Sequence, residues 1–434
     1  MNKGRLSALL PIGVFLVLYL GLGVTFEYVL KIPMGFYNVP IVVAFLVAIL
    51  TACIQNRALN FEDKLGVMAI GLSDKNIITM ILIFLVSGIF VGVVGRNSAD
   101  SVAYFLLSLV PARFSVVTLF IIAAFVSLAM GTSVGTITLI TPIAVSLSTA
   151  SGANLPLCLA SVVGGSMFGD NLSFISDTTI AATGGQGCKM RDKFRENLKI
   201  ALPAAILSAV IILLLTWNAD LSAATNNSYN LVQIIPYLLV LIGGIAGINV
   251  FLVLIIGIVS GAIITFILGG VTIPQMLSNM GSGAAGMFET AIIAVLVSAL
   301  CALVREYGGF DALLHLIGRV FKGKRGGQLG MGLLVGAMDI ATANNTVAIV
   351  MANPIAKQMS NDYGISPSKA ASILDTFSCV FQGIIPYGAQ MLVALSVASE
   401  MGAAVSAFQI IPLLFYSFLL LLSSLAFIAF DKKQ

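Results

Sequence analysis

The sequence predicts an all-α polytopic membrane protein with about ten transmembrane spans, two re-entrant hairpins and two inverted repeats with broken helices. Three observations favour this fold class. Hydrophobic residues make up 59% of the chain and charged residues only 9%, whereas a soluble domain has about 25% charged residues. Many apolar runs reach the roughly 20 residues that a helix needs to cross a bilayer. Several other apolar segments are interrupted by polar or small residues.

The simple runs are each long enough to cross once, and the first is too long for a signal peptide. They lie at 6–30, 36–54, 76–95, 199–217, 230–247, 249–270, 286–304 and 407–430. Two more, 156–182 and 370–398, contain polar residues with Gly or Pro and predict broken helices. Apolar residues at helical spacing between 310 and 321 predict an amphipathic helix in the membrane plane.

The segments 113–149 and 326–360 are too long for one simple span and have breaks at 131–133 and 343–346. If both are hairpins that return to the side they entered, both termini lie in the cytoplasm. In that topology 19 of the 22 Lys and Arg residues also lie on the cytoplasmic side. This is the distribution that cytoplasmic loops normally have. If 113–149 instead crossed completely, the basic cluster at 189–199 would lie outside. The charges therefore favour hairpins, whose tips should line a polar cavity.

The order of these elements repeats along the chain. Residues 1–229 contain three spans, hairpin 113–149, broken helix 156–182 and a span, and residues 230–434 contain the same series with hairpin 326–360 and broken helix 370–398. An odd number of crossings in each half makes the halves inverted. Paired interrupted segments in inverted halves are typical of the binding site of a secondary transporter.

Carboxylates within the first broken helix indicate a cation site. Asp170 and Asp177 lie in the stretch 169–179, and an acid at this depth costs about 2.5–3.5 kcal/mol unless it faces a cavity. Na⁺ prefers oxygen ligands, as other hard cations do. The candidate ion or substrate ligands are Asp170, Asn171, Ser173, Asp177, Thr178, Thr132, Ser133, Asp339, Asn344, Asn345, Thr346, Asp375 and Gln382, and the proposed Na⁺ ligands are Asp170, Asn171 and Asp177.

Several of these residues have structural alternatives. Ser173, Thr178 and Thr346 are equally suited to capping helix ends. Asp339 and Asp375 could each pair with Lys369 or another cytoplasmic base. The cluster 189–199 is interpreted mainly as an orientation signal. The five scattered cysteines and the single histidine, His315, match no metal-site or disulfide spacing, so no cofactor is expected.

The motif Gly-Asp-Asn-Leu-Ser-Phe-Ile-Ser-Asp-Thr-Thr (169–179) resembles the signature of the NhaC-type sodium/proton antiporter family. The hairpin tips are similar to those of the wider superfamily of ion transporters with paired re-entrant loops. The resemblance covers roughly residues 75–400 and implies Na⁺ and H⁺ as transported or coupling ions. One departure is Phe174, where the family usually has Pro. The missing Pro leaves the ion stoichiometry open. Because some relatives carry small carboxylates or amino acids, the resemblance also leaves the cargo open.

Two transport functions follow. The first is exchange of Na⁺ for H⁺ at buried aspartates by alternating access; the second is Na⁺- or H⁺-coupled transport of a small organic solute. An enzyme is not expected, since a zinc protease needs more than one histidine and Met167-Phe168-Gly169-Asp170 lacks the first Gly of an intramembrane aspartyl protease. The expected partners are the lipid bilayer and small cations, without nucleic acid, and a homodimer is left open. We expect a bacterial cytoplasmic membrane and cytoplasmic termini.

Overall fold

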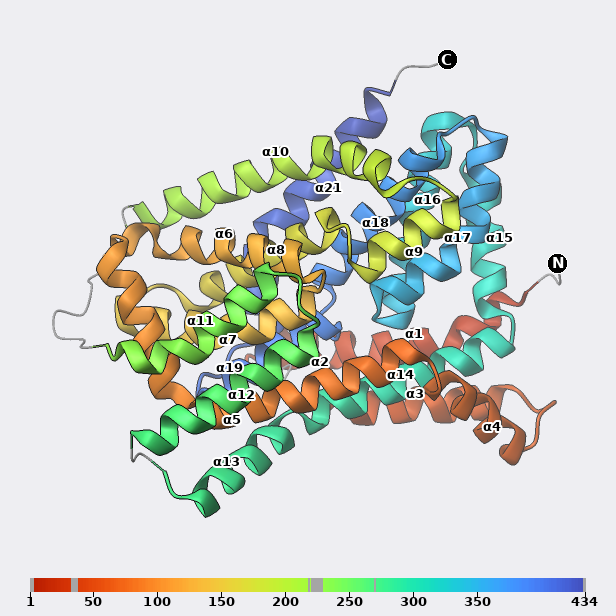
Figure 1. The fold of residues 1–434 in the computed structure, drawn as a ribbon. Coiled ribbons are helices and arrows are strands. Elements are labelled where there is room, and N and C mark those ends of the chain that lie inside the picture. The colour runs from red at the N-terminus through yellow and green to blue at the C-terminus, as the bar shows by residue number, and fades with distance from the viewer. Residues whose placement is uncertain (1–3, 33–37, 218, 220–228, 269–270, 432–434) are drawn as a thin grey trace.

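The protein consists of helices, and no strand occurs in the described residues, which are 4–32, 38–217, 219, 229–268 and 271–431 of the computed structural model (Figure 1). The first span is one continuous helical segment formed by η1 (Leu6–Leu9), α1 (Leu10–Leu16), η2 (Val17–Gly21), α2 (Leu22–Val24) and η3 (Thr25–Val29). Then follow α3 (Ile41–Gln55), α4 (Phe61–Leu72) and α5 (Lys75–Leu109), which bends at Gly95, where φ is +67°.

The predicted hairpin 113–149 consists of α6 (Ala112–Met130) and α7 (Ser133–Ser151), and 326–360 consists of α16 (Gly323–Thr342) and α17 (Asn345–Asp362). Both tips have the same construction. A residue in the left-handed region, Gly131 or Ala343, ends the first helix. The next residue, Thr132 or Asn344, caps the second helix by accepting a hydrogen bond from the third backbone N–H.

The predicted broken helices are also present. In the first half, α8 (Leu155–Leu172) and α9 (Asp177–Gln186) are separated by residues 173–176. In the second half, α18 (Pro367–Ile384) and α19 (Ala389–Glu400) are separated by residues 385–388. The helices α8 and α18 both begin after a capping side chain, Asn154 and Ser366, and both have Pro in the first turn.

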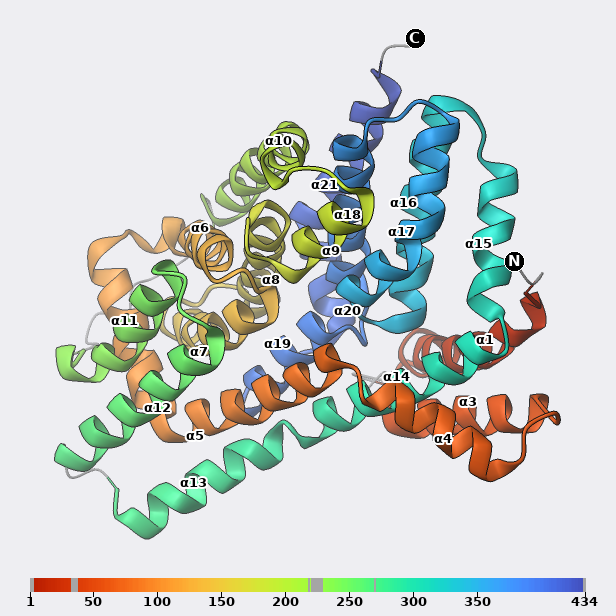
Figure 2. The same ribbon diagram turned by 45° about the vertical axis from the view of Figure 1, so that its right-hand side comes forward.

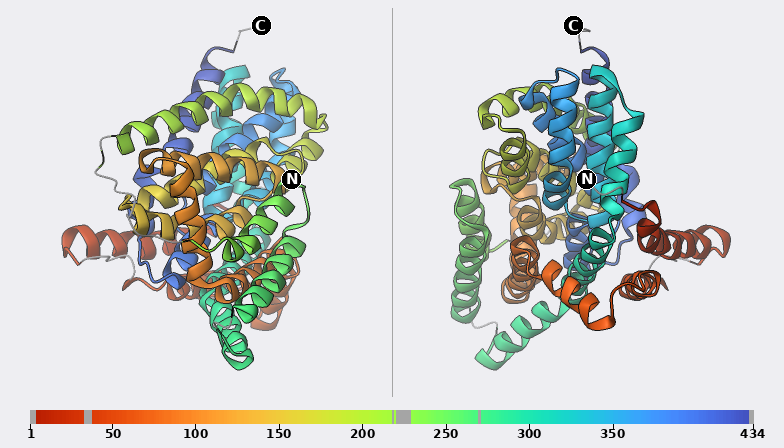
Figure 3. Two further views of the ribbon diagram at one scale, coloured as in Figure 1. Left: turned by 60° about the vertical axis from the view of Figure 1, so that its left-hand side comes forward. Right: turned by 90° about the vertical axis from the view of Figure 1, so that its right-hand side faces the viewer.

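The remaining helices surround these interrupted elements. In the right-hand view of Figure 3, the N-terminal helices and the α11–α12 pair lie on opposite sides of the central helices. Figure 2 shows α16 and α17 running together next to α15. The helices not yet described are α10 (Met190–Trp217), α11 (Leu231–Ile245), α12 (Val250–Ile267), α13 (Ile273–Gly286), α14 (Phe288–Glu306), α15 (Gly309–Val320), α20 (Ala407–Ile410), η5 (Ile411–Leu413) and α21 (Phe415–Ala429).

Within the described residues, nine helices are long and apolar enough to cross a membrane, or ten if the bent pair 407–413 and 415–429 forms one span. The predicted all-helical membrane fold with about ten spans is therefore confirmed. Both α6 and α7 belong to this set, so their length does not distinguish a re-entrant hairpin from two crossings, and that interpretation of 113–149 stays a prediction. The pair α16 and α17 does not belong to it, and the interpretation of 326–360 as a re-entrant hairpin also stays a prediction.

Two helices differ from the prediction. The sequence analysis assigned no element to α4, which contains Glu62, Asp63 and Lys64, or to α13, which is rich in Gly, Ser and Asn. Neither forms a 20-residue apolar run, so each escapes a search for spans. The helix α13 packs tightly against α5, since a Cβ on Gly88 would lie 2.1 Å from the Gly283 carbonyl oxygen.

Candidate functional site

The two hairpin tips, the first helix break and the helix ends beside the second break meet at one cavity of about 80 Å³, which we call the central cavity. It is lined by residues of α5, α7, α8, α9, α17, α18 and α19 and by the segments between them. Its polar lining residues are Thr79, Thr132, Ser133, Asp170, Ser176, Asp177, Thr178, Asn344, Asn345, Thr346, Gln382 and Gln390. The prediction that hairpin tips line a polar cavity is confirmed.

Asp170 lies in the last turn of α8 and is only 5% exposed. Ser133 Oγ donates a hydrogen bond of 2.8 Å to Asp170 Oδ2, and the Ser176 hydroxyl donates to Asp170 Oδ1. No Lys or Arg of the described part of the chain forms an ion pair with this carboxylate. A buried acid with hydroxyl partners alone is suited to hold a cation or a proton.

A chain of hydrogen bonds connects Asp170 to the tip of the second hairpin. Gln390 Nε2 donates to Ser133 Oγ at 3.0 Å, and Gln382 Nε2 donates to Gln390 Oε1 at 2.7 Å. The same Gln382 amide also donates to the Ala343 carbonyl oxygen at 3.0 Å. Both tips therefore contact one continuous polar network, in which Gln382 replaces the acid that the first half has.

The second tip contributes amides to the cavity. Asn344 Oδ1 accepts from the Val347 N–H at 3.0 Å, and its Nδ2 lies 3.1 Å from Met80 Sδ. Asn345 Oδ1 accepts from the Thr346 N–H at 3.0 Å, while its buried Nδ2 has no hydrogen-bond partner in the described residues. Asn345 thus has a free donor beside the cavity.

The expectation that both acids of the motif are buried holds for Asp170 and is wrong for Asp177. Asp177, the first residue of α9, lines the cavity but is exposed. A carboxylate is favourable in this first turn of a helix. Thr178, the next residue, shares a hydrogen bond of 2.8 Å with the Ser176 hydroxyl.

Four predicted ligands do not line the central cavity. Ser173 accepts from the Ile175 N–H at 3.2 Å within the break, which is the structural alternative. Asp339 is buried, and both of its carboxylate oxygens lack a hydrogen-bond partner in the described residues. Asn171 and Asp375 belong to a second polar network. The proposed Na⁺ ligand set of Asp170, Asn171 and Asp177 is thereby divided between two places.

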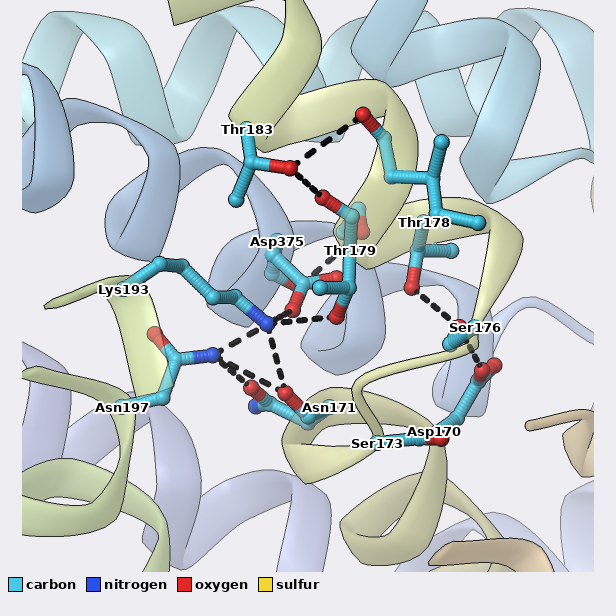
Figure 4. A network of polar contacts seen from close by, with 12 residues as sticks. Asp170, Asn171, Ser173, Ser176, Thr178, Thr179, Thr183, Lys193, Asn197 and Asp375 are labelled. Atoms are coloured by element: carbon cyan, nitrogen blue, oxygen red, sulfur yellow. Dashed lines mark hydrogen bonds and ion pairs between the residues drawn. The ribbon is translucent and has the colours of Figure 1, made fainter. Parts of the chain in front are cut away.

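This second network is centred on Lys193 of α10 (Figure 4). Lys193 Nζ donates to the Asn171 carbonyl oxygen and to Thr179 Oγ1, both at 2.7 Å, and forms an ion pair with Asp375. Asn197 Nδ2 donates to the Asn171 carbonyl oxygen at 3.0 Å and to Asp375 Oδ2 at 3.2 Å. We call the group of oxygens around Lys193 Nζ the Lys193 site.

Asp375 was expected to pair with Lys369 or with another base, and the structure shows the second alternative. Lys369 pairs with Asp431 at 2.8 Å, and the base that reaches Asp375 is Lys193 of the cluster 189–199. The sequence analysis treated that cluster as an orientation signal and missed Lys193 and Asn197. A signal was present, since Lys193 and Asn197 share helical spacing with the buried residues Ile200, Ala201 and Ala204.

Paired interrupted helices around a cavity with a buried acid define a secondary transporter of small cations. The profile of the Na⁺/H⁺ antiporter family matches residues 8–217 and 219–432. The chain therefore belongs to the Na⁺/H⁺ antiporter family, and the predicted family and the predicted class of function, sodium/proton antiport in a membrane, are confirmed.

Three curated relatives are similar over most of their length. The NhaC Na⁺/H⁺ antiporter of Alkalihalophilus pseudofirmus is 22% identical and covers 91% of this chain and 90% of its own. NhaC of Bacillus subtilis is 22% identical, with 83% and 85% covered. The malate-2H⁺/Na⁺-lactate antiporter of Bacillus subtilis is 24% identical, with 73% and 71% covered.

Among solved structures, the YdaH transporter of Alcanivorax borkumensis matches with a TM-score of 0.43 and 16% identity. The match covers 80% of this chain and 84% of that one.

Proposed function

We propose that the chain exchanges Na⁺ for H⁺ with Asp170 as the group that binds the two ions in alternation. The single observation that supports this role is the setting of Asp170, which is buried, faces the central cavity and accepts hydrogen bonds from hydroxyls rather than an ion pair. A carboxylate in this setting neutralises either a proton or a Na⁺ ion. If the cavity opens alternately to each side, this competition alone couples the two ion flows.

The ligands of Na⁺ would be the oxygens around the first break. Besides the Asp170 carboxylate, these are the hydroxyls of Ser133, Ser176 and Thr178. Asp177 would attract the cation at the exposed side of the cavity without being a buried ligand. In the second half, Asn345, Thr346 and Gln382 would complete the polar wall.

The test is sodium-driven proton flux in proteoliposomes that contain a pH-sensitive dye. We expect flux with a Na⁺ gradient and no added solute, and we expect Asp170→Asn to reduce it to the level of empty liposomes. Asp362→Asn, at the exposed end of α17, is the matched control and should retain wild-type flux. Wild-type flux in Asp170→Asn would remove Asp170 from the binding site.

An organic cargo is the second candidate, favoured by the relative that is named as a malate and lactate antiporter. The amide groups of Asn344, Asn345 and Gln390 could bind a carboxylate of such a solute. Against it, two relatives that match most of this chain are named as Na⁺/H⁺ antiporters. Flux that requires one acid from a panel of carboxylic and amino acids would favour this candidate.

We also propose that the chain acts as a transporter without an enzymatic reaction, with both termini in the cytoplasm of a bacterial cell. Family membership supports the first statement, and the distribution of Lys and Arg supports the second. Labelling of single cysteines placed between 189 and 199 tests the orientation, because they should react only from the cytoplasmic side. The two inverted repeats, 1–229 and 230–434, and a homodimer stay predictions.

A further inference from the structure

The Lys193 site has the composition of a cation site. Three kinds of oxygen surround the ammonium group: the Asn171 carbonyl and the Thr179 hydroxyl, each at 2.7 Å, and the Asp375 carboxylate. They come from α8, α9 and α18, so both halves of the chain contribute. Carbonyl, hydroxyl and carboxylate oxygens are also the ligands that hard metal cations prefer.

The site is fully enclosed and has an unused carboxylate oxygen. Lys193 is 1% exposed and Asp375 is 0% exposed. Asp375 Oδ1 is buried and lacks a hydrogen-bond partner in the described part of the chain. A buried acceptor without a donor is unfavourable. The Asp375 carboxylate therefore offers one more oxygen ligand than the lysine ammonium uses.

Stability of the fold does not explain such an ion pair. Desolvation of two charges offsets most of their attraction, and buried pairs can often be replaced by apolar side chains at no loss. The residues that continue the buried face of Lys193 along α10 are apolar: Ile200, Ala201 and Ala204. Apolar residues in place of both Lys193 and Asp375 would avoid the cost of burying two charges, so the pair calls for a functional reason.

Neighbouring residues connect the Lys193 site to the central cavity. Asp170 faces the cavity, while the carbonyl of the next residue, Asn171, faces Lys193. In the same way, Thr178 lines the cavity and Thr179 contacts Lys193. Figure 4 shows these two pairs on either side of the same break. Movement of the segment 173–176 would thus change both groups of ligands together.

We propose that the Lys193 ammonium is a tethered cation that permanently occupies a second cation site, and that without it the Asn171, Thr179 and Asp375 oxygens bind Na⁺. Lys193 thereby limits the number of mobile cations, because the charge of Asp375 is neutralised by the protein while the charge of Asp170 is left to the transported ions. The inference adds a second site to the proposed function, and it is tested by binding, without transport.

The experiment counts Na⁺ bound per chain by equilibrium binding of ²²Na⁺ to purified protein. We expect Lys193→Met to bind one more Na⁺ than the wild type, because the ammonium is lost and the Asp375 carboxylate remains. The matched control, Lys193→Met with Asp375→Asn, has lost both charges and should bind the wild-type number. An unchanged number in Lys193→Met would overturn the proposal.

Folding is monitored in parallel, since Lys193→Met leaves a buried charge. We expect its melting temperature to rise with Na⁺ far more steeply than that of the double variant. If Lys193→Met stays unfolded in high Na⁺ while the double variant folds, free Na⁺ cannot replace the ammonium and the proposal is wrong.

The same count in an Asp170→Asn background separates this inference from the proposed function. If Asp170 binds Na⁺, the Asp170→Asn variant should bind one Na⁺ fewer than the wild type. If the Lys193 site binds Na⁺, the Asp170→Asn, Lys193→Met double variant should bind one Na⁺ more than Asp170→Asn alone.

Discussion

Ser133 Oγ lies 2.8 Å from Asp170 Oδ2, so the first residue of α7 is bound directly to the last turn of α8. The hydroxyl also accepts from Gln390 at 3.0 Å. Ser133 thus joins the buried carboxylate, the first hairpin tip and the second broken helix. This position makes it the hydroxyl most suited to orient Asp170 toward a bound cation.

Ser133→Ala should weaken Na⁺ binding without unfolding the chain. A hydrogen bond to a charged group contributes about 1.5–3 kcal/mol, which corresponds to at least about a tenfold increase in the Na⁺ concentration for half-maximal proton flux. Flux in proteoliposomes over a range of Na⁺ concentrations measures this shift. Ser148→Ala is the control, because Ser148 lies at the other end of α7 and donates to the Ala153 carbonyl. Equal Na⁺ dependence in the two variants would contradict the role of Ser133.

The positions of the breaks could be predicted from the sequence because the signals are local. Polar residues, Gly and Pro interrupt apolar runs at the first tip, at the second tip and in the two broken helices, and clusters of such residues favour a helix end. A single proline does not suffice, since Pro142 and Pro354 lie inside α7 and α17. The predicted segment 156–182 accordingly corresponds to α8 and α9, and 370–398 corresponds to α18 and α19.

The pairing of charges could not be predicted, because it depends on contacts between distant segments. Lys193 and Asp375 lie in different halves of the chain and meet only when α10 packs against α18. Similarly, the exposure of Asp177 depends on which side of the break faces the cavity mouth, and nothing in the residues 169–179 specifies it. Composition identified the acids, whereas tertiary packing determines which acid is neutralised.

Gln382 and Gln390 should be energetically coupled. Gln390 accepts from Gln382 at 2.7 Å and donates to Ser133, so loss of either amide leaves a buried partner unsatisfied. We expect Gln382→Leu and Gln390→Leu each to lower the unfolding free energy by about 1–3 kcal/mol. The decrease in unfolding free energy of the double variant should be smaller than the sum of the two single decreases, by about 0.5–3 kcal/mol. Thermal unfolding of the four proteins in one detergent measures the cycle, and strict additivity would argue against the network.

Gly131→Ala should destabilise the first tip more than an ordinary glycine substitution. At φ +68° an L-residue costs about 1–2 kcal/mol, and a Cβ here would lie 2.6 Å from Ile175 Cγ1 and 3.0 Å from the Ile175 carbonyl carbon. The close contact with Ile175 should lower the unfolding free energy by about 1–3 kcal/mol more.

Gly152 at the other end of α7 is the matched control for Gly131. Its φ is +73°, and no described atom lies within 4 Å of its Cβ position, so Gly152→Ala tests the conformational term alone. The difference in melting temperature between the two variants isolates the contact with Ile175. Equal melting temperatures would show that the tip and the break 173–176 do not press together.

Asp431 should attach the end of α21 to α16 and α18 in a pH-dependent way. Partial burial raises the pKa of Asp431, but hydrogen bonds from Lys369 and Gln328 and the charges of Lys369 and Lys324 outweigh it, so the pKa lies below its usual 3.8. Because the folded-state pKa is depressed, this contribution to stability is present above about pH 3.8 and is lost as the pH falls through the folded-state value.

Asp431→Asn should therefore lower stability at neutral pH, by about 1 kcal/mol or less because the pair lies near the surface. Unfolding of wild type and variant from neutral to acidic pH measures this, and the two curves should converge below pH 3.8. A gap between Asp431→Asn and wild type that persists at the lowest pH would mean that Asp431 acts through packing rather than through its charge.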